Sequence, residues 1–148
     1  MNLWHITEAL VELLEQVPGV SAYPGMQDSV LTSGATTAIV VRADSPFIPS
    51  YHQAMSGGRV EILMVLEIIC PRSSMRDAQQ RIFELLSAGT GETASLIDTL
   101  RPNDRPNPLD GLVHDFTLMQ VSGLEERTIG DLSYVGCDIS VRFYAART

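Results

Sequence analysis

Histidine and cysteine are the residues through which a small domain most often binds a metal or performs nucleophilic chemistry. The chain has three histidines, His5, His52 and His114, and two cysteines, Cys70 and Cys137. None of them recurs at a spacing that brings two ligands together, such as Cys-x-x-Cys or two histidines four positions apart. We therefore expect no metal site among them, and we interpret both cysteines as buried, reduced thiols of the core.

Paired carboxylates and glycine-rich loops are the other candidates for chemistry. Glu61 and Glu67 share one face of a predicted strand, but six residues of strand separate them by about 20 Å, which is too far for general acid–base partners. Glu125 and Glu126 lie in a predicted turn, where we expect them to be solvated. The run Ser56-Gly57-Gly58-Arg59 precedes a strand instead of opening a helix, so it is typical of a turn and not of a phosphate loop. We predict no catalytic, cofactor-binding or metal-binding residue.

Three segments show helical patterns. Ile6, Leu10, Leu13, Leu14 and Val17 follow helical spacing, and Pro18-Gly19 ends that helix. Ser74 to Asp77 forms a Ser-x-x-Asp capping box ahead of a second helix that reaches Leu86. A third, shorter helix is predicted from Thr93 to Leu100.

The remaining apolar segments are predicted strands, with a polar turn between the last two. The strand segments are Val20–Tyr23, Ala38–Val41, Arg59–Cys70, Leu112–Val121 and Ser133–Ala145, and the turn is Ser122–Leu132. Arg59–Cys70 is largely apolar on both faces, which indicates a central strand. Ser133–Ala145 alternates between apolar and polar residues, which indicates one face in the core and one outside.

The order of these elements predicts one α+β domain over residues 1–148. We expect a mostly antiparallel sheet of four to five strands with two or three helices packed on one face. A chain of 148 residues with 45% hydrophobic and 19% charged residues is long enough to fold around its own core.

The net charge of the chain argues against two classes of partner. The chain has 18 acidic residues against 10 basic ones, all of them arginine, for a net charge of −8. This sign argues against nucleic-acid binding and against an anionic membrane surface. The sequence has no apolar run long enough to span a membrane, and its N-terminus lacks the basic segment of a secretory signal, so we expect neither a membrane anchor nor secretion.

A long loop at residues 43–58 is the feature most suggestive of a partner contact. It contains Pro46, Pro49 and His52. It also contains apolar and aromatic residues that a loop would expose, namely Phe47, Ile48, Tyr51 and Met55. The loop either folds back on its own domain or forms an arm that inserts into a neighbouring subunit. The polar face of the last strand is the second candidate surface.

The conjunction of several segments resembles a known family. The residues concerned are Val-Pro-Gly-Val at 17–20, Tyr23-Pro24, Gly57-Gly58-Arg59, the helix start Ser74 to Arg81 with Arg-Asp-Ala-Gln-Gln-Arg, Leu85 to Gly89, Val121 to Gly123, and Tyr134 to Val141. In this order and spacing the chain resembles, over nearly its whole length, the tail terminator or tail completion proteins of long-tailed bacteriophages.

The resemblance implies a virion structural protein without catalysis or cofactors. Such proteins form a homo-oligomeric ring, commonly of six subunits, that caps the tail tube, stops its polymerisation and meets the head-completion proteins of the neck, while DNA passes through the lumen without specific binding. The protein would be assembled in the host cytoplasm and located in the tail of the virion. The expected interface residues are Phe47, Ile48, Tyr51, His52, Met55, Glu125, Glu126, Arg142 and Tyr144. Two alternatives remain open: another ring protein of the neck or tail, and a small cytoplasmic ligand-binding domain or enzyme.

Overall fold

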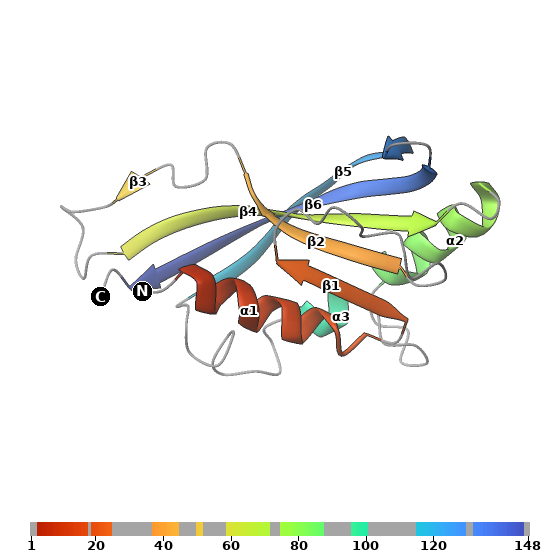
Figure 1. The fold of residues 1–148 in the computed structure, drawn as a ribbon. Helices are drawn as coiled ribbons and strands as arrows, with labels where there is room; N and C mark the ends of the chain where they lie inside the picture. The colour runs from red at the N-terminus through yellow and green to blue at the C-terminus, as the bar shows by residue number, and fades with distance from the viewer. Residues whose placement is uncertain are drawn as a thin grey trace.

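The computed structural model describes residues 3–17, 19–24, 37–44, 50–51, 59–71, 75–87, 96–100, 115–129 and 132–146. Its elements, in chain order, are α1 (Leu3–Leu14), β1 (Val20–Pro24), β2 (Thr37–Ala43), β3 (Ser50–Tyr51), β4 (Arg59–Pro71), α2 (Met75–Leu86), α3 (Leu96–Leu100), β5 (Asp115–Ile129) and β6 (Leu132–Ala146) (Figure 1). The predicted α+β class is confirmed.

All the described strands belong to one mixed sheet. Its order is β1-β2-β4-β6-β5, with β3 pairing beside β2 on β4. β1 and β2 run parallel, and the other pairs are antiparallel. The expectation of a mostly antiparallel sheet is compatible with this mixed sheet, in which β1 and β2 point the same way.

β4 and β6 form the middle of this sheet. β4 pairs with β6 over its whole length, from Arg59 opposite Ala146 to Pro71 opposite Tyr134. β4 also pairs with β2 on its other side, which confirms that it is a central strand. Its alternate residues from Val60 to Ile68 are buried in the main core, because both neighbours cover its edges and the helices cover one of its faces.

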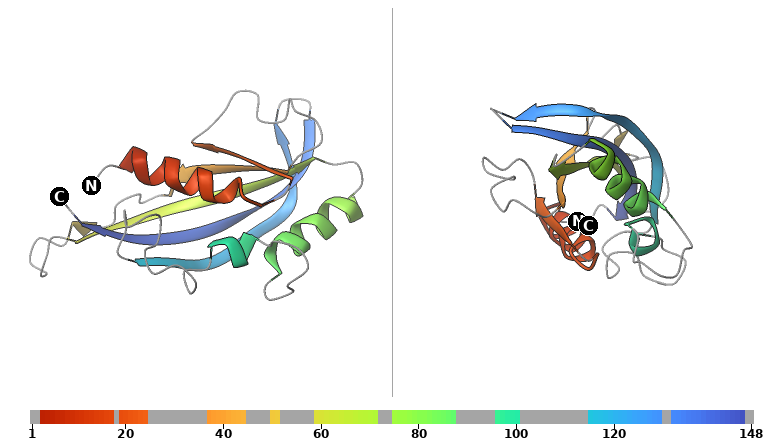
Figure 2. Two further views of the ribbon diagram at one scale, coloured as in Figure 1. Left: turned by 90° about the horizontal axis from the view of Figure 1, so that it is seen from below. Right: turned by 90° about the vertical axis from the view of Figure 1, so that its right-hand side faces the viewer.

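The helices lie on one side of the sheet; in Figure 1, α1 and α3 lie below it and α2 lies at its right-hand end (Figures 1 and 2). α1 buries Ile6, Leu10, Leu13 and Leu14 at helical spacing, and α2 buries Ala78, Ile82 and Leu85. α1 packs on β1 and β2, whereas α2 packs on β4 and β6. The same core also buries the predicted inner face of β6, which consists of Val135, Cys137, Ile139, Val141 and Phe143. The sheet curves around the helices (Figure 2). No helix in the described ranges has the length and apolar character to cross a membrane.

The prediction was wrong for the segment after Val121. We expected a polar turn over Ser122–Leu132, but β5 continues to Ile129 and pairs with β6 up to Ile129 opposite Leu132. This polar segment forms a strand because the backbone of β6 pairs with it. Two register breaks, between Leu118 and Gln120 and between Ser122 and Glu125, accommodate the residues that do not pair. Composition gives no information on a partner strand, so a polar edge strand and a polar turn look alike in the sequence.

The proposed arm at 43–58 is only partly within the described residues. Ala43 ends β2, and Ser50 and Tyr51 pair with Glu61 and Val60 of β4. Residues 45–49 and 52–58 lie outside the described part, and so do Phe47, Ile48, His52 and Met55. The capping box at Ser74, the start of the third predicted helix and His114 also lie outside it. The arm therefore remains a prediction.

Candidate functional site

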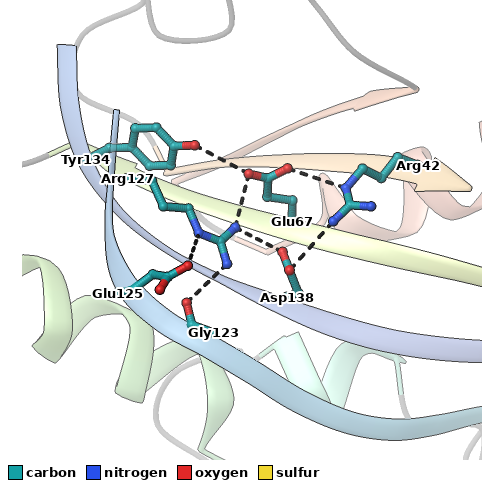
Figure 3. Close-up of polar contacts among 7 residues, drawn as sticks. All are labelled: Arg42, Glu67, Gly123, Glu125, Arg127, Tyr134 and Asp138. Carbon is teal, nitrogen blue, oxygen red and sulfur yellow. Dashed lines mark hydrogen bonds and ion pairs between the residues drawn. The ribbon is translucent and has the colours of Figure 1, made fainter. Parts of the chain in front are cut away.

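The face of the sheet that points away from the helices carries a group of charged side chains from four strands (Figure 3). Arg42 comes from β2, Glu67 from β4, Asp138 from β6 and Arg127 from β5. Glu67 and Asp138 are directly opposite each other in the β4–β6 pairing. Residues that are directly opposite share a face, so this register brings two carboxylates side by side. We call Arg42, Glu67, Arg127 and Asp138 the ionic cluster.

Arg127 is the centre of the ionic cluster. Its Nη1 donates to Asp138 Oδ1 at 3.0 Å and to Glu67 Oε1 at 3.1 Å. Its Nη2 donates to the carbonyl oxygen of Gly123 at 3.1 Å, and its Nε lies 3.5 Å from Glu125 Oε1 (Figure 3). The side chain of Arg127 is only 16% exposed, which makes these charge-assisted bonds stronger than a surface ion pair.

Arg42 closes the ionic cluster from the opposite side. Its Nε lies 3.5 Å from Glu67 Oε2, and its Nη2 lies 3.6 Å from Asp138 Oδ2. Each carboxylate thus has a guanidinium on both sides, and the two positive charges balance the two negative ones. This arrangement avoids the repulsion that two adjacent carboxylates on neighbouring strands would otherwise produce.

Two glycines make room for the Arg127 side chain. A Cβ at Gly136 would lie 2.9 Å from the carbonyl oxygen of Ile68 and 3.3 Å from Arg127 Cδ. Gly123, at a φ of 73°, sits in the second register break of β5, where its carbonyl accepts from Arg127. A positive φ of this size is open to glycine at little cost. Arg127 therefore passes over β6 at its glycine to reach Glu67 on β4.

Tyr134 ties the ionic cluster to a small apolar group on the same face. Its hydroxyl donates to Glu67 Oε1 at 3.4 Å, while its ring is buried with Ala38, Val40 and Ile69. Burial, and then the charge of Glu67, raise the pKa of Tyr134. The predicted outward face of β6 is therefore not uniformly solvated, because Tyr134 lies buried on it.

The electrostatics of Arg127 agree with its geometry. Burial by itself would lower the pKa of Arg127, but the hydrogen bond to Asp138 and its charge, followed by those of Glu67, raise the pKa above its usual value. The carboxylates of Glu67 and Asp138 are both paired with arginines. The ionic cluster therefore joins strands, and neither carboxylate is free to act as a general base. We interpret the ionic cluster as a structural link between β2, β4, β6 and β5.

The predicted interface residues on β5, Glu125 and Glu126, lie next to the ionic cluster. Glu125 and Glu126 are exposed, as expected, but they lie within a strand and not in a turn. Glu125 is 63% exposed at its side chain and pairs with Arg127. Sequence reasoning missed the ionic cluster itself. The only available signal was that Glu67 and Asp138 occupy outward positions of two long strands.

The predicted pair on β6 forms a separate contact. Arg142 and Tyr144 are half-buried on the same face as the ionic cluster, and the Arg142 guanidinium carbon lies 5.3 Å from the centre of the Tyr144 ring. Arg142 Nε is buried and has no hydrogen-bond partner among the residues that the structure describes. Four residues of strand, about 13 Å, separate Arg142 from Asp138, so the structure does not bring this pair into the ionic cluster.

Within the described ranges, the edge strand β5 carries three of the five exposed large apolar side chains. Met119, Val121 and Leu124 are 51%, 46% and 40% exposed. Within the described residues β5 pairs with β6 alone, so its outer edge is the end of the sheet. An exposed, apolar edge strand is a surface to which another chain can bind.

Neither cysteine takes part in these surfaces. Cys70 and Cys137 are buried and unbridged, which confirms the prediction of core thiols. Burial raises the pKa of the Cys137 thiol to about 11. In the parts of the chain that the structure describes, no group of three or more histidine, cysteine or acidic residues is arranged to bind a metal ion.

Comparison with known proteins adds no family to this description. The chain matches no protein-family model and no curated protein sequence.

Proposed function

We propose that this chain is a structural subunit that forms a homo-oligomeric ring on the tail tube of a long-tailed bacteriophage, stops tube polymerisation and joins the tail to the neck. The observation that carries a role in protein–protein contact is the exposed apolar edge of β5, with Met119, Val121 and Leu124. The resemblance described above supplies the phage setting.

The physical logic of such a ring is heterologous contact. Each subunit presents one surface to its neighbour and a different surface to the next, so that rotation closes the ring. An open sheet with an exposed edge strand, together with the segment around Phe47, Ile48, Tyr51 and Met55, provides candidate surfaces for that contact. One end of the ring repeats the contacts of a tube subunit and the other does not, so growth of the tube stops.

The net charge of −8 supports passage of DNA without retention. A channel lined by acidic subunits repels the phosphate backbone, whereas a basic lining would hold it. In the proposed ring, the partners of each subunit are a second copy of the chain, the tail tube protein and a head-completion protein.

The decisive experiment is negative-stain electron microscopy of particles produced when this gene carries an early stop codon. Filled heads beside detached tails of uncontrolled length are expected. Detached tails of normal length beside heads that leak DNA would move the protein to head completion. Normal infectious particles would refute a structural role in the virion and favour the ligand-binding alternative, for which a metabolite-dependent rise in Tm is the discriminating assay.

A second test addresses the arm. Replacing Tyr51 and Met55 by Asp is expected to leave the subunit folded while it abolishes attachment of tails to heads. Retention of both folding and attachment would show that this segment does not contact a partner.

A further inference from the structure

The two register breaks of β5 present apolar side chains to solvent. Met119 and Leu124 fall within the breaks, have no partner residue on β6 and are exposed. Val121, between the breaks, is also exposed, although it is opposite the buried Ile139. We call Met119, Val121 and Leu124 the β5 patch. Bulges of this kind re-aim side chains and interrupt the regular backbone edge, so the β5 patch suits contact through side chains better than strand addition.

Negative charge borders the β5 patch. Glu125 follows Leu124 directly, and its side chain is 63% exposed. The whole of β5 carries three acidic residues against one arginine. A surface that covers the β5 patch must therefore be apolar at its centre and must not bring further negative charge to Glu125.

The other large apolar side chains that the described residues expose are two aromatic residues on helices. Trp4 on α1 and Phe83 on α2 are each 56% exposed. α1 contains two glutamates and no arginine, and one of them, Glu8, accepts a hydrogen bond from the Trp4 ring nitrogen. α2 contains two arginines and two acidic residues, so these charges cancel. The surface around Phe83 is therefore compatible with Glu125, whereas the surface around Trp4 would repel it.

Arg76 gives the exposed face of α2 a positive end. Seven residues separate Arg76 from Phe83, which places both on one stripe of α2, about 10 Å apart along the helix axis. Both are exposed, because α2 packs on β4 and β6 through another side, with Ala78, Ile82 and Leu85. Within the described ranges, Arg76 takes part in no ion pair. Its charge is thus available to a partner.

We propose that the exposed face of α2 in a second copy of the chain docks on the β5 patch. Phe83 covers Val121 and Leu124, and Arg76 reaches Glu125. The spacings are comparable, since Val121 and Glu125 lie about 13 Å apart along a strand and Phe83 and Arg76 about 10 Å apart along a helix. The two surfaces differ, as the heterologous contact of a ring requires. This inference rests on the proposed homo-oligomer and names the surfaces that meet in it.

Self-association of the full chain measures this contact directly. A dilution series followed by two-dimensional NMR reports each backbone amide, and sedimentation velocity over the same concentrations reports the size of the assembly. At concentrations up to about 1 mM, the weak end of specific binding, we expect two sets of amides to shift. These are the amides of α2 around Phe83 and those of the β5 patch, and they should share one midpoint.

Phe83→Ser and Trp4→Ser form a matched pair of variants. Each removes one aromatic side chain of equal exposure from the surface of a helix. We expect Phe83→Ser to raise the Kd of self-association at least about tenfold, because an aromatic anchor dominates a small contact. Trp4→Ser is expected to leave the Kd within about twofold of wild type. Circular dichroism checks that both variants fold.

A double-mutant cycle tests the pairing of Arg76 with Glu125. Arg76→Gln and Glu125→Gln are each expected to raise the Kd about two- to fivefold, the effect of an exposed ion pair. The double variant is expected to bind no more weakly than the weaker of the two single variants. Effects that multiply in the double variant would show that the two side chains do not meet. The cycle also serves if Phe83→Ser does not fold.

Three further results would overturn the inference. The first is a chain that stays monomeric at all of these concentrations. The second is an effect of Phe83→Ser no greater than that of Trp4→Ser. The third is a shift of the β5 patch without a shift of α2, since another part of the second copy would then occupy the patch. None of these results refutes the proposed function, which fails instead if particles made without the chain are normal.

Discussion

Replacement of Gly136 by Ala tests the close approach of β4, β6 and Arg127. A methyl group at this position would lie 2.9 Å from the carbonyl oxygen of Ile68, 3.2 Å from Tyr134 Cε2 and 3.3 Å from Arg127 Cδ. The first contact is the most severe because a backbone oxygen of a central strand has no rotamer to which it can move. The other two involve side chains that can shift by a few tenths of an ångström.

The expected magnitude is the difference between two opposing terms. Overpacking a well-packed site costs about 1–3 kcal/mol. Removing glycine from a strand returns about 0.5–1 kcal/mol through the smaller entropy of the unfolded chain. Because the severe contact is with a backbone oxygen, we expect the overpacking cost in the upper part of its range, about 2–3 kcal/mol. The net loss in the free energy of unfolding is then about 1–2.5 kcal/mol, which for a domain of this size lowers Tm by roughly 2–10 °C.

Thermal and urea unfolding followed by circular dichroism measures this loss. Ser140→Ala is the matched control, because Ser140 is half-buried on the same face of the same strand; we expect it to change stability by less than about 0.5 kcal/mol. Adding Arg127→Ala to Gly136→Ala is not expected to restore stability, since the contact with Ile68 remains. A Gly136→Ala protein as stable as wild type would refute the reasoning.

The remaining predictions concern the core, the thiols and the exposed tryptophan. Phe143→Ala is expected to destabilise the protein by about 3–5 kcal/mol in urea unfolding, because Phe143 is fully buried; a loss below about 1 kcal/mol would contradict that burial. Burial raises the pKa of the Cys137 thiol from 9.0 to about 11, so the unfolded chain loses this proton first and the free energy of unfolding falls as pH rises from about 9 to 11, by at most about 2–3 kcal/mol. Cys137→Ala should flatten that part of the pH profile, and an unchanged slope would count against it. Trp4 is 56% exposed, with its ring nitrogen donating to Glu8 at 2.8 Å, so its fluorescence should be quenched readily by acrylamide in the folded state, and Trp4→Ala should change stability by less than about 1 kcal/mol. Strong protection from the quencher would place Trp4 in a contact that this structure lacks.

The elements that the sequence predicted well are those whose burial repeats locally. The spacing of Ile6, Leu10 and Leu13 requires a helix with one covered face, and the alternation along β6 requires a strand with one covered face. These periodicities follow from backbone geometry, so they are legible without knowledge of any partner element. The apolar character of β4 on both faces likewise indicated a central strand, and its pairing with β2 on one edge and β6 on the other confirms this.

The second half of β5 shows where local patterns fail. Ser122–Ile129 is polar and contains Gly123, which is typical of a turn. It is a strand because β6 pairs with it and because Glu67, sixty residues earlier, neutralises Arg127. The parallel direction of β1 against β2 escaped prediction for a related reason, since the alternation within a strand is the same whichever way its neighbour runs. The surfaces at Phe47, Ile48, His52 and Met55 remain predictions.

The sequence by itself therefore determined α1, α2, β4 and β6, and the buried side of α1 and β6, because these are set by periods of a few residues. Tertiary structure alone decided the ionic cluster. The β4–β6 register places Glu67 opposite Asp138, and two breaks in β5 bring Arg127 across Gly136 to meet them. A shift of one residue in that register would send Glu67 and Asp138 to opposite faces of the sheet, and register is a property of the pairing of distant segments that no single segment contains.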